Sequence, residues 1–169
     1  EPVAEAILDA LTGASSGGTG SAGPVVSVLT AGPVAQSARV VFPLPEGTWV
    51  LTSEFGPRIH PITGTRRLHA GIDIATPCGQ PIVAALDGEI ISAGWGGGYG
   101  NRVVIDHGIQ RGVPVATSYN HMQRIAVSGG RVTRGQVIGY EGTTGFSTGC
   151  HLHFETYVNG DPVNPRGWL

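Results

Sequence analysis

Short runs rich in β-branched and aromatic residues follow one another from about residue 40 to the end of the chain, separated by glycine, proline, asparagine or aspartate. They recur at spacings of about 8 to 16 residues, and no apolar period typical of a helix lies between them. The runs cover residues 49–51, 72–74, 82–84, 89–91, 103–105, 116–119, 137–140 and 152–155. This spacing predicts an all-β domain over residues 40–169, built from antiparallel sheets in a sandwich or barrel-like arrangement.

The composition fits this class and excludes others. Of the 169 residues, 28 are glycine and 13% are charged, as in a turn-rich β protein. The formal net charge is -2 and lysine is absent, so no basic stripe is available to bind nucleic acid. No apolar run reaches the roughly 20 residues of a membrane span. The chain starts at Glu1 without a leader pattern, so we expect a mature or trimmed product.

Two different patterns precede the β domain. Residues 1–12 carry apolar side chains on one face of a helix, at positions 4, 7, 8 and 11, which predicts a short helix that is marginal in isolation. Residues 13–39 consist mainly of glycine, serine, alanine, threonine and proline. This composition indicates a flexible linker or arm before the folded domain.

One pattern occurs twice within the β region. Residues 81–90 and 132–139 each contain a strand-like run, a tight glycine turn and a second strand-like run. The two units resemble the half-repeats of biotinyl and lipoyl carrier domains, which form a barrel-sandwich hybrid. Those domains carry their cofactor on a hairpin lysine, and this chain contains none. The pattern therefore supports a related architecture and argues against the carrier function.

A histidine and an aspartate lie at 69 and 73, and two more histidines lie at 151 and 153. Side chains alternate between the faces of a strand, so His69 and Asp73 share one face, and His151 and His153 share a face of their own strand. One histidine of the second pair would complete a set of His, Asp and His. Three protein ligands and one open position are typical of catalytic zinc, whereas calcium prefers more carboxylates. The alternation leaves both histidines as candidates.

At these positions the sequence resembles the lysostaphin/LytM-type zinc metallopeptidases, a family of glycyl-glycine and peptidoglycan endopeptidases. Four stretches carry the resemblance: FGPRIHP at 55–61, HAGID at 69–73, YNH at 119–121 and HLHFE at 151–155. Each motif alone is weak, but all four in order between about residues 46 and 165 are specific. The resemblance implies a LytM peptidase domain that hydrolyses peptide bonds in bacterial peptidoglycan stems or cross-bridges.

Carried over position by position, the resemblance implies that His69, Asp73 and His153 hold one zinc ion. It assigns His151 as the general base and His121 as the second catalytic histidine. Zinc lowers the pKa of bound water to about 7, and neighbouring histidines can move its proton and stabilise the oxyanion. The resemblance also implies a secreted or cell-envelope protein with peptidoglycan as its partner, and we expect a monomer.

Substrate contacts are expected from the same groove. The resemblance places Arg58 and His60 beside it. Tyr99, in a glycine-rich segment, is a candidate for a groove wall, and Tyr119, in the Tyr-x-His motif, is a fourth contact. His107 is not assigned to the metal, and we expect it to be a packed or solvated structural residue.

The two cysteines, Cys78 and Cys150, can form at most one disulfide, which would indicate an oxidising compartment; the alternative is a pair of buried thiols. Cys150 precedes His151 in an extended segment, so its side chain faces away from the two histidines and is a poor candidate for the metal. We therefore favour a disulfide that braces both halves of the site.

Two alternatives to a freely active enzyme follow from the family. One is a catalytically silent module that binds the wall or activates another hydrolase, and such domains have typically lost ligand residues that are present here. The other is a latent enzyme whose N-terminal segment blocks the groove with an asparagine ligand. No asparagine precedes Asn101, so Asp9 or Glu5 would have to replace it. Family members cut either glycine bridges or direct cross-links containing D-amino acids.

Overall fold

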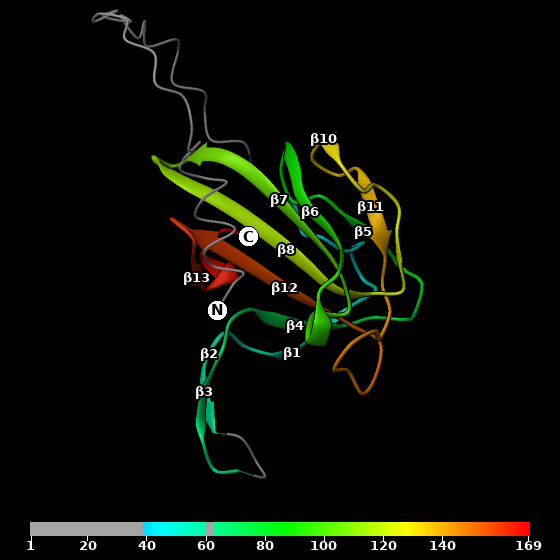
Figure 1. Cartoon of the computed structure of the whole chain (residues 1–169), viewed down its shortest axis with the longest axis vertical. Coiled ribbons are helices and arrows are strands. Elements are labelled where there is room, and N and C mark those ends of the chain that lie inside the picture. The colour runs from blue at the N-terminus through cyan, green and yellow to red at the C-terminus, as the bar shows by residue number, and fades with distance from the viewer. Residues whose placement is uncertain (1–38, 60–62) are drawn as a thin grey trace, which may run out of the picture.

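The computed structural model describes residues 39–59 and 63–169, and within them every regular element except two short 3-10 helices is a β-strand (Figure 1). The expectation of an all-β domain without long helices is therefore confirmed. The helix expected at 1–12, and all but the last residue of the arm expected at 13–39, lie outside the described residues. No helix in the described ranges is long and apolar enough to cross a membrane.

Each run that the sequence predicts as a strand overlaps a strand of the structure. The strands are β1 (Val50–Ser53), β2 (Gly56–Ile59), β3 (Arg66–His69), β4 (Ile72–Ala75), β5 (Pro81–Val83), β6 (Gly88–Trp95), β7 (Asn101–Gln110), β8 (Val113–Met122), β9 (Arg124–Ile125), β10 (Gly130–Val132), β11 (Val137–Tyr140), β12 (His151–Val158) and β13 (Asp161–Val163). The 3-10 helices are η1 (Gly97–Tyr99) and η2 (Pro165–Gly167).

An eight-stranded antiparallel sheet forms the larger layer, in the order β1-β4-β12-β8-β7-β6-β10, with β13 paired to β12. β12 lies between β4 and β8 (Figure 1). In this register His153 is opposite Asp73 on β4 and opposite Asn120 on β8. Strand pairing therefore brings three motif stretches that are far apart in the sequence to one place on the sheet.

The two strand-turn-strand units pair with each other rather than within themselves. The first unit comprises β5 and β6, and the second comprises β10 and β11. β5 pairs with β11 in a three-stranded sheet that also contains β9, whereas β6 pairs with β10 in the main sheet. Each glycine turn therefore carries the chain from one sheet to the other.

Apolar side chains from both sheets meet in one core. Members that are at most 1% exposed include Ile72, Ile74, Ile82, Ile138, Leu152 and Phe154. Burying a side chain of this size stabilises the fold by roughly 1.5 to 3 kcal/mol relative to exposing it. Because Leu152 and Phe154 point into this core, the intervening His153 is directed to the opposite face of β12.

Two features lie at the edges of this body. The β2–β3 hairpin forms a separate two-stranded ribbon that projects from the main sheet (Figure 1). Cys78 and Cys150 form a disulfide with their Cα atoms 5.3 Å apart, as expected from the sequence. It joins the turn after β4 to the loop before β12, so it connects the two strands that carry Asp73 and His153.

Candidate metal centre and catalytic groups

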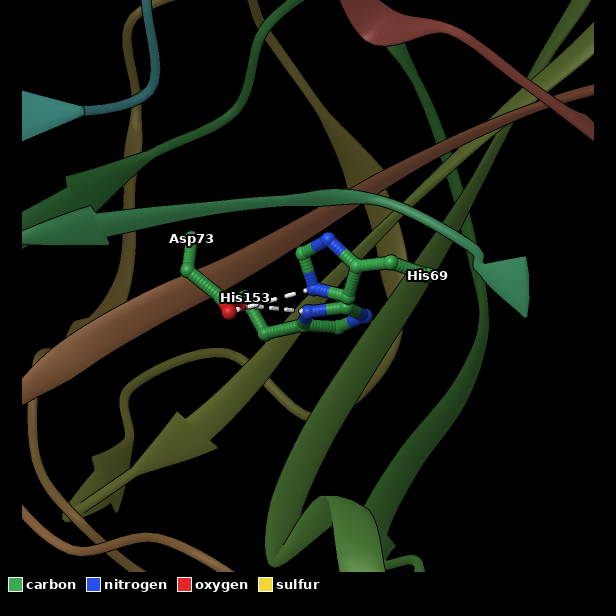
Figure 2. Close-up of side chains that lie close together, drawn as sticks. All are labelled: His69, Asp73 and His153. Atoms are coloured by element: carbon green, nitrogen blue, oxygen red, sulfur yellow. Dashed lines mark hydrogen bonds and ion pairs between the residues drawn. The ribbon is translucent and has the colours of Figure 1, made fainter. Parts of the chain in front are cut away.

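Asp73 contacts both His69 and His153 at the centre of the site, as the dashed lines of Figure 2 show. Its Oδ2 atom is 3.1 Å from Nε2 of His69, and its Oδ1 atom is 2.7 Å from Nδ1 of His153. One candidate ligand atom from each of the three residues lies within 4.8 Å of those of the other two. In the described part of the chain this is the one cluster of three or more His, Cys, Asp or Glu side chains with such spacing.

The backbone places these groups with little freedom. Asp73 and His153 lie opposite each other on β4 and β12, and His69 ends β3 just before the chain turns into β4. That turn contains Gly71, where a Cβ atom would overlap the carbonyl oxygen of Phe154. A glycine is therefore required for the turn to approach β12 closely enough to bring His69 to Asp73.

The outward nitrogen of each of these histidines is held by an acceptor. Nδ1 of His69 is 2.7 Å from the carbonyl oxygen of Glu54, and Nε2 of His153 is 2.9 Å from Oε1 of Glu155. An imidazole N–H must donate each bond because a carbonyl or carboxylate oxygen accepts. In the neutral rings, Nε2 of His69 and Nδ1 of His153 then present lone pairs toward Asp73. Such a convergence of acceptors fits a divalent cation, and the His/His/carboxylate set fits zinc.

The pKa values of these groups also indicate that a positive charge is favoured here. Burial lowers the pKa of His153, but its hydrogen bonds to Asp73 and Glu155 outweigh burial and raise that pKa to about 9. Burial raises the pKa of Asp73, but the hydrogen bonds from His153 and His69 bring it well below its usual range. The two carboxylates flanking His153 therefore stabilise a cation, whether a proton or a metal ion, at this position.

Glu155 orients His153 from below and is itself held by three neighbours. It is fully buried and bonded to Ser118 Oγ at 3.0 Å, to Arg102 Nη2 at 3.4 Å and to the hydroxyl of Tyr157. Burial raises its pKa, but the hydrogen bond from His153 and the nearby charges of His153 and Arg102 lower it overall. Glu155 is not among the site residues predicted from the sequence, although the alternation of His151, His153 and Glu155 along β12 indicates that it shares their face.

Two further histidines face the cluster. Nδ1 of His151 is 2.9 Å from the carbonyl oxygen of Gly149, and Nδ1 of His121 is 2.7 Å from that of Thr144. Their ring centroids are 4.7 Å apart, and Nε2 of His151 is 3.8 Å from Oδ1 of Asp73. In its neutral form each ring therefore presents an Nε2 lone pair beside the cluster. Burial is the main reason that the pKa of His121 is lowered, so this ring favours the neutral form.

The sequence profile of peptidase family M23 matches residues 67–165, a stretch that contains all five of these residues. The chain belongs to this family. It is 50% identical over 115 residues to the DD-carboxypeptidase/endopeptidase Mpg of Neisseria meningitidis, covering 68% of this chain and 26% of that protein. It is 41% identical over 121 residues to the peptidoglycan DD-endopeptidase ShyA of Vibrio cholerae, covering 70% and 27%. The chain thus spans about a quarter of the length of these curated relatives.

Solved structures of this family share the fold. The catalytic domain of the antimicrobial peptidase lysostaphin from Staphylococcus simulans superimposes with a TM-score of 0.60 and 33% identity, covering 70% of this chain and 90% of that domain. A zinc-containing peptidase from Vibrio cholerae gives a TM-score of 0.67 and 41% identity, covering 73% and 37%. The likeness to the lysostaphin/LytM family seen in the sequence is therefore confirmed, as is its fold.

A pocket of about 460 Å³ lies over the cluster of His69, Asp73 and His153. Its lining residues are Arg58, Arg67, His69, Asp73, Gly96, Gly98, Tyr99, His121, Phe146, His151 and His153. Of the expected substrate contacts, Arg58 and Tyr99 thus lie on the pocket wall. The sequence did not predict Arg67 or Phe146 as pocket residues. Phe146 is 90% exposed, so its ring is accessible to a ligand in the pocket.

One expected substrate contact is wrong. Tyr119 is fully buried, and its hydroxyl bonds to the N–H of Ala85 and to Oγ1 of Thr117, both at 2.9 Å. Burial also raises the pKa of Tyr119 to about 12. Alternation along β8 would put Tyr119 and His121 on one face, but the left-handed backbone of His121, with φ of 63°, turns that side chain out of the pattern. The Tyr-x-His spacing therefore brings one residue to the core and the other to the pocket.

The two remaining histidines of the sequence are His60 and His107. His60 lies outside the described residues. His107 is buried away from the pocket and is bonded to the carbonyl oxygen of Asp87 at 2.8 Å and to Oγ1 of Thr117 at 2.7 Å. His107 is thus a packed structural residue, as expected.

Proposed function

We propose that this M23 domain is a zinc metalloendopeptidase that hydrolyses peptide bonds in bacterial peptidoglycan. The observation that carries the proposal is the set of four imidazoles around Asp73, each with its outward nitrogen bonded to an oxygen and its other nitrogen directed to the pocket. The substrate class is supported by the relatives, of which one is described as a DD-carboxypeptidase/endopeptidase and another as a peptidoglycan DD-endopeptidase.

His69, Asp73 and His153 would hold the metal ion through Nε2, a carboxylate oxygen and Nδ1. When bound, zinc supplies Lewis acidity that lowers the pKa of a water molecule and polarises a peptide carbonyl. Glu155 fixes the tautomer of His153 from the far side, and the Glu54 carbonyl does the same for His69. These bonds hold the ligand atoms ready for the metal, so little rearrangement is needed on binding.

His151 is proposed as the general base, because its Nε2 lies beside Asp73 and its Nδ1 is held by the Gly149 carbonyl, which leaves Nε2 as the acceptor nitrogen of the neutral ring. In a peptidase the proton taken from the nucleophile must reach the departing amine, and an imidazole can carry it. His121 presents a lone pair in its neutral form, so it becomes a donor to the oxyanion only after it accepts a proton. Its lowered pKa makes this proton readily released.

The disulfide supports a place of action outside the cytoplasm, because disulfides persist in oxidising compartments. Peptidoglycan lies in the same region of the cell. We therefore propose an extracytoplasmic wall hydrolase. The complete ligand set argues against a catalytically silent module, which has no need of a preformed cation site.

The experiment that tests the proposal is digestion of purified sacculi by the zinc-loaded protein, followed by detection of new amino termini. Released amines that disappear with a chelator and return on addition of zinc would support it. Binding to sacculi without any new amino terminus would instead identify a silent wall-binding module. The variant His151→Ala, which keeps all three proposed ligands, serves as the control that is expected to be inactive.

A further inference from the structure

Two arginines lie directly opposite each other on the β2–β3 hairpin. Arg58 on β2 is paired in register with Arg67 on β3, and both side chains are exposed. Side chains at opposed positions of an antiparallel pair have Cβ atoms roughly 5 Å apart, and like charges there destabilise the pair. The hairpin therefore keeps two positive charges together at a cost in stability.

Strand alternation directs this pair to the catalytic side of the hairpin. Arg67 and His69 are two residues apart on β3 and share a face, whereas Arg66 and Leu68 belong to the other face. The pocket confirms this division, because Arg58, Arg67 and His69 line it and Arg66 does not. The two guanidinium groups thus lie beside the proposed zinc ligands rather than in open solvent on the far face.

The positive charge of this pair is not balanced within the described part of the chain. Arg58 donates to Ser53 Oγ at 3.3 Å, and neither Arg58 nor Arg67 forms an ion pair with a carboxylate there. By contrast, Arg102 and Arg166 are each paired with a glutamate. Asp73 is the one carboxylate among the described residues that line the pocket, and it is already bonded to His69 and His153. The pair is therefore free to bind an anion.

We propose that Arg58 and Arg67 together bind a free carboxylate of the substrate next to the scissile bond. This inference rests on the proposed function and names its substrate class. A carboxylate has two acceptor oxygens that match the donor fork of a guanidinium group. Among the described residues, the opposite wall is formed by Gly98, Tyr99 and Phe146, which carry no formal charge, so the positive charge lies on the hairpin side of the pocket.

This selection distinguishes the two kinds of wall cross-link. A glycine within a bridge has no free carboxylate, because its only carboxyl group is part of the peptide bond. In a direct cross-link, a diamino acid that supplies the amine of the scissile bond keeps a carboxylate on the same carbon as that amine. The arginine pair therefore favours direct cross-links that bear such a carboxylate over uncharged glycine bridges.

The test compares two synthetic cross-linked peptide dimers that differ only in this carboxylate, free in one and amidated in the other. Zinc-loaded wild type is expected to cleave the free acid with a kcat/KM roughly 10- to 100-fold above that of the amide. Arg67→Ala and Arg58→Ala should each lose most of this preference, because kcat/KM falls for the free-acid dimer and stays unchanged for the amide dimer. Arg67→Lys, which keeps the charge without the fork, should retain part of it.

Arg66→Ala is the matched control, because it removes the same charge from the adjacent position on the other face of β3. It should keep the wild-type ratio of acid to amide cleavage. Equal cleavage of both dimers by wild type, or an equal change of the ratio in Arg66→Ala and Arg67→Ala, would overturn the carboxylate assignment while leaving the hydrolase intact. Cleavage of neither dimer nor of sacculi would overturn the proposed function itself. The cleavage rate of the amide dimer in each variant reports whether its catalytic site is folded.

Discussion

His153 and Asp73 face each other across β12 and β4, with Nδ1 and Oδ1 2.7 Å apart, although 80 positions separate them in the sequence. The contact follows from one strand pairing, so any change that shifts the register of β12 by one residue would replace His153 with a core residue at this position. The buried Leu152 and Phe154 oppose such a shift because it would expose them. The packing of Leu152 and Phe154 in the core therefore also fixes the register that places His153 opposite Asp73.

Removal of the Glu155 carboxylate should weaken metal binding without removing a ligand. Glu155→Gln can still contact His153 but no longer provides a negative charge behind it. Loss of such a partner typically lowers metal affinity by roughly 10- to 100-fold. Zinc affinity measured by competition with a chromophoric chelator checks this. Glu46→Gln, at an exposed position, is the control and should keep the wild-type zinc affinity. An unchanged zinc affinity in Glu155→Gln would contradict the role of Glu155.

Replacement of His151 should separate catalysis from metal binding. His151→Ala removes the proposed base but none of the three proposed ligands, so the zinc content is expected to stay at the wild-type level. The value of kcat should fall by roughly 100- to 10,000-fold, the usual contribution of general acid-base catalysis. Zinc analysis and peptide cleavage on one sample check both statements. A variant that loses its zinc would assign His151 to the metal instead.

Reduction of the disulfide should loosen the loop that precedes β12. Cys78 and Cys150 are separated by 72 positions, and a cross-link closing a loop of this length stabilises a fold by roughly 4 kcal/mol in the chain-entropy model. The double variant with Ala at both positions should therefore unfold at a markedly lower temperature than the oxidised protein. Thermal unfolding with and without reductant checks this, and the double variant should show no response to reductant. Equal unfolding temperatures for wild type in both states would contradict the bracing role.

Glu141 should make the stability of the domain depend on pH. It is fully buried, neither carboxylate oxygen has a hydrogen-bond partner in the described chain, and burial raises its pKa from 4.5 to about 8. Between these two values the folded state keeps a proton that the unfolded state releases, so stability falls as the pH rises through this window.

Glu141→Gln removes this titration. Between pH 5 and pH 8 the stability of this variant relative to wild type should rise by roughly 3 kcal/mol. Urea unfolding at several pH values measures the difference, with Glu46→Gln as the exposed counterpart. A constant difference between wild type and Glu141→Gln over this range would show that Glu141 is not the titrating group.

The eight strand-like runs could be located from the sequence because each combines β-branched residues with flanking turn residues. The β2–β3 hairpin was missed since its residues, such as Arg58 and Arg66, are mostly exposed and show no apolar alternation. The His/Asp spacing identified the metal cluster, yet the choice of His153 over His151 came from the family resemblance. The structure supports this choice through Glu155, which contacts His153 and not His151.

Tyr119 and Arg67 show what the sequence could not reveal. Tyr119 was wrongly predicted to contact the substrate together with its neighbour His121. The two side chains separate because His121 has a positive φ, a backbone conformation that is uncommon for a histidine and has no sequence signal here. Arg67 became a candidate only through its register with Arg58, which depends on the length of the hairpin loop. Both depend on how strands pair, and residue types alone do not determine that.

The most direct test of the metal assignment is the zinc content per chain of wild type and His153→Ala, measured with sacculus cleavage on the same preparations. The assignment predicts one zinc ion per wild-type chain with chelator-sensitive release of new amino termini, and loss of both in His153→Ala. A wild-type protein that cleaves sacculi without zinc, or a His153→Ala variant that keeps both the zinc and the cleavage, would contradict it.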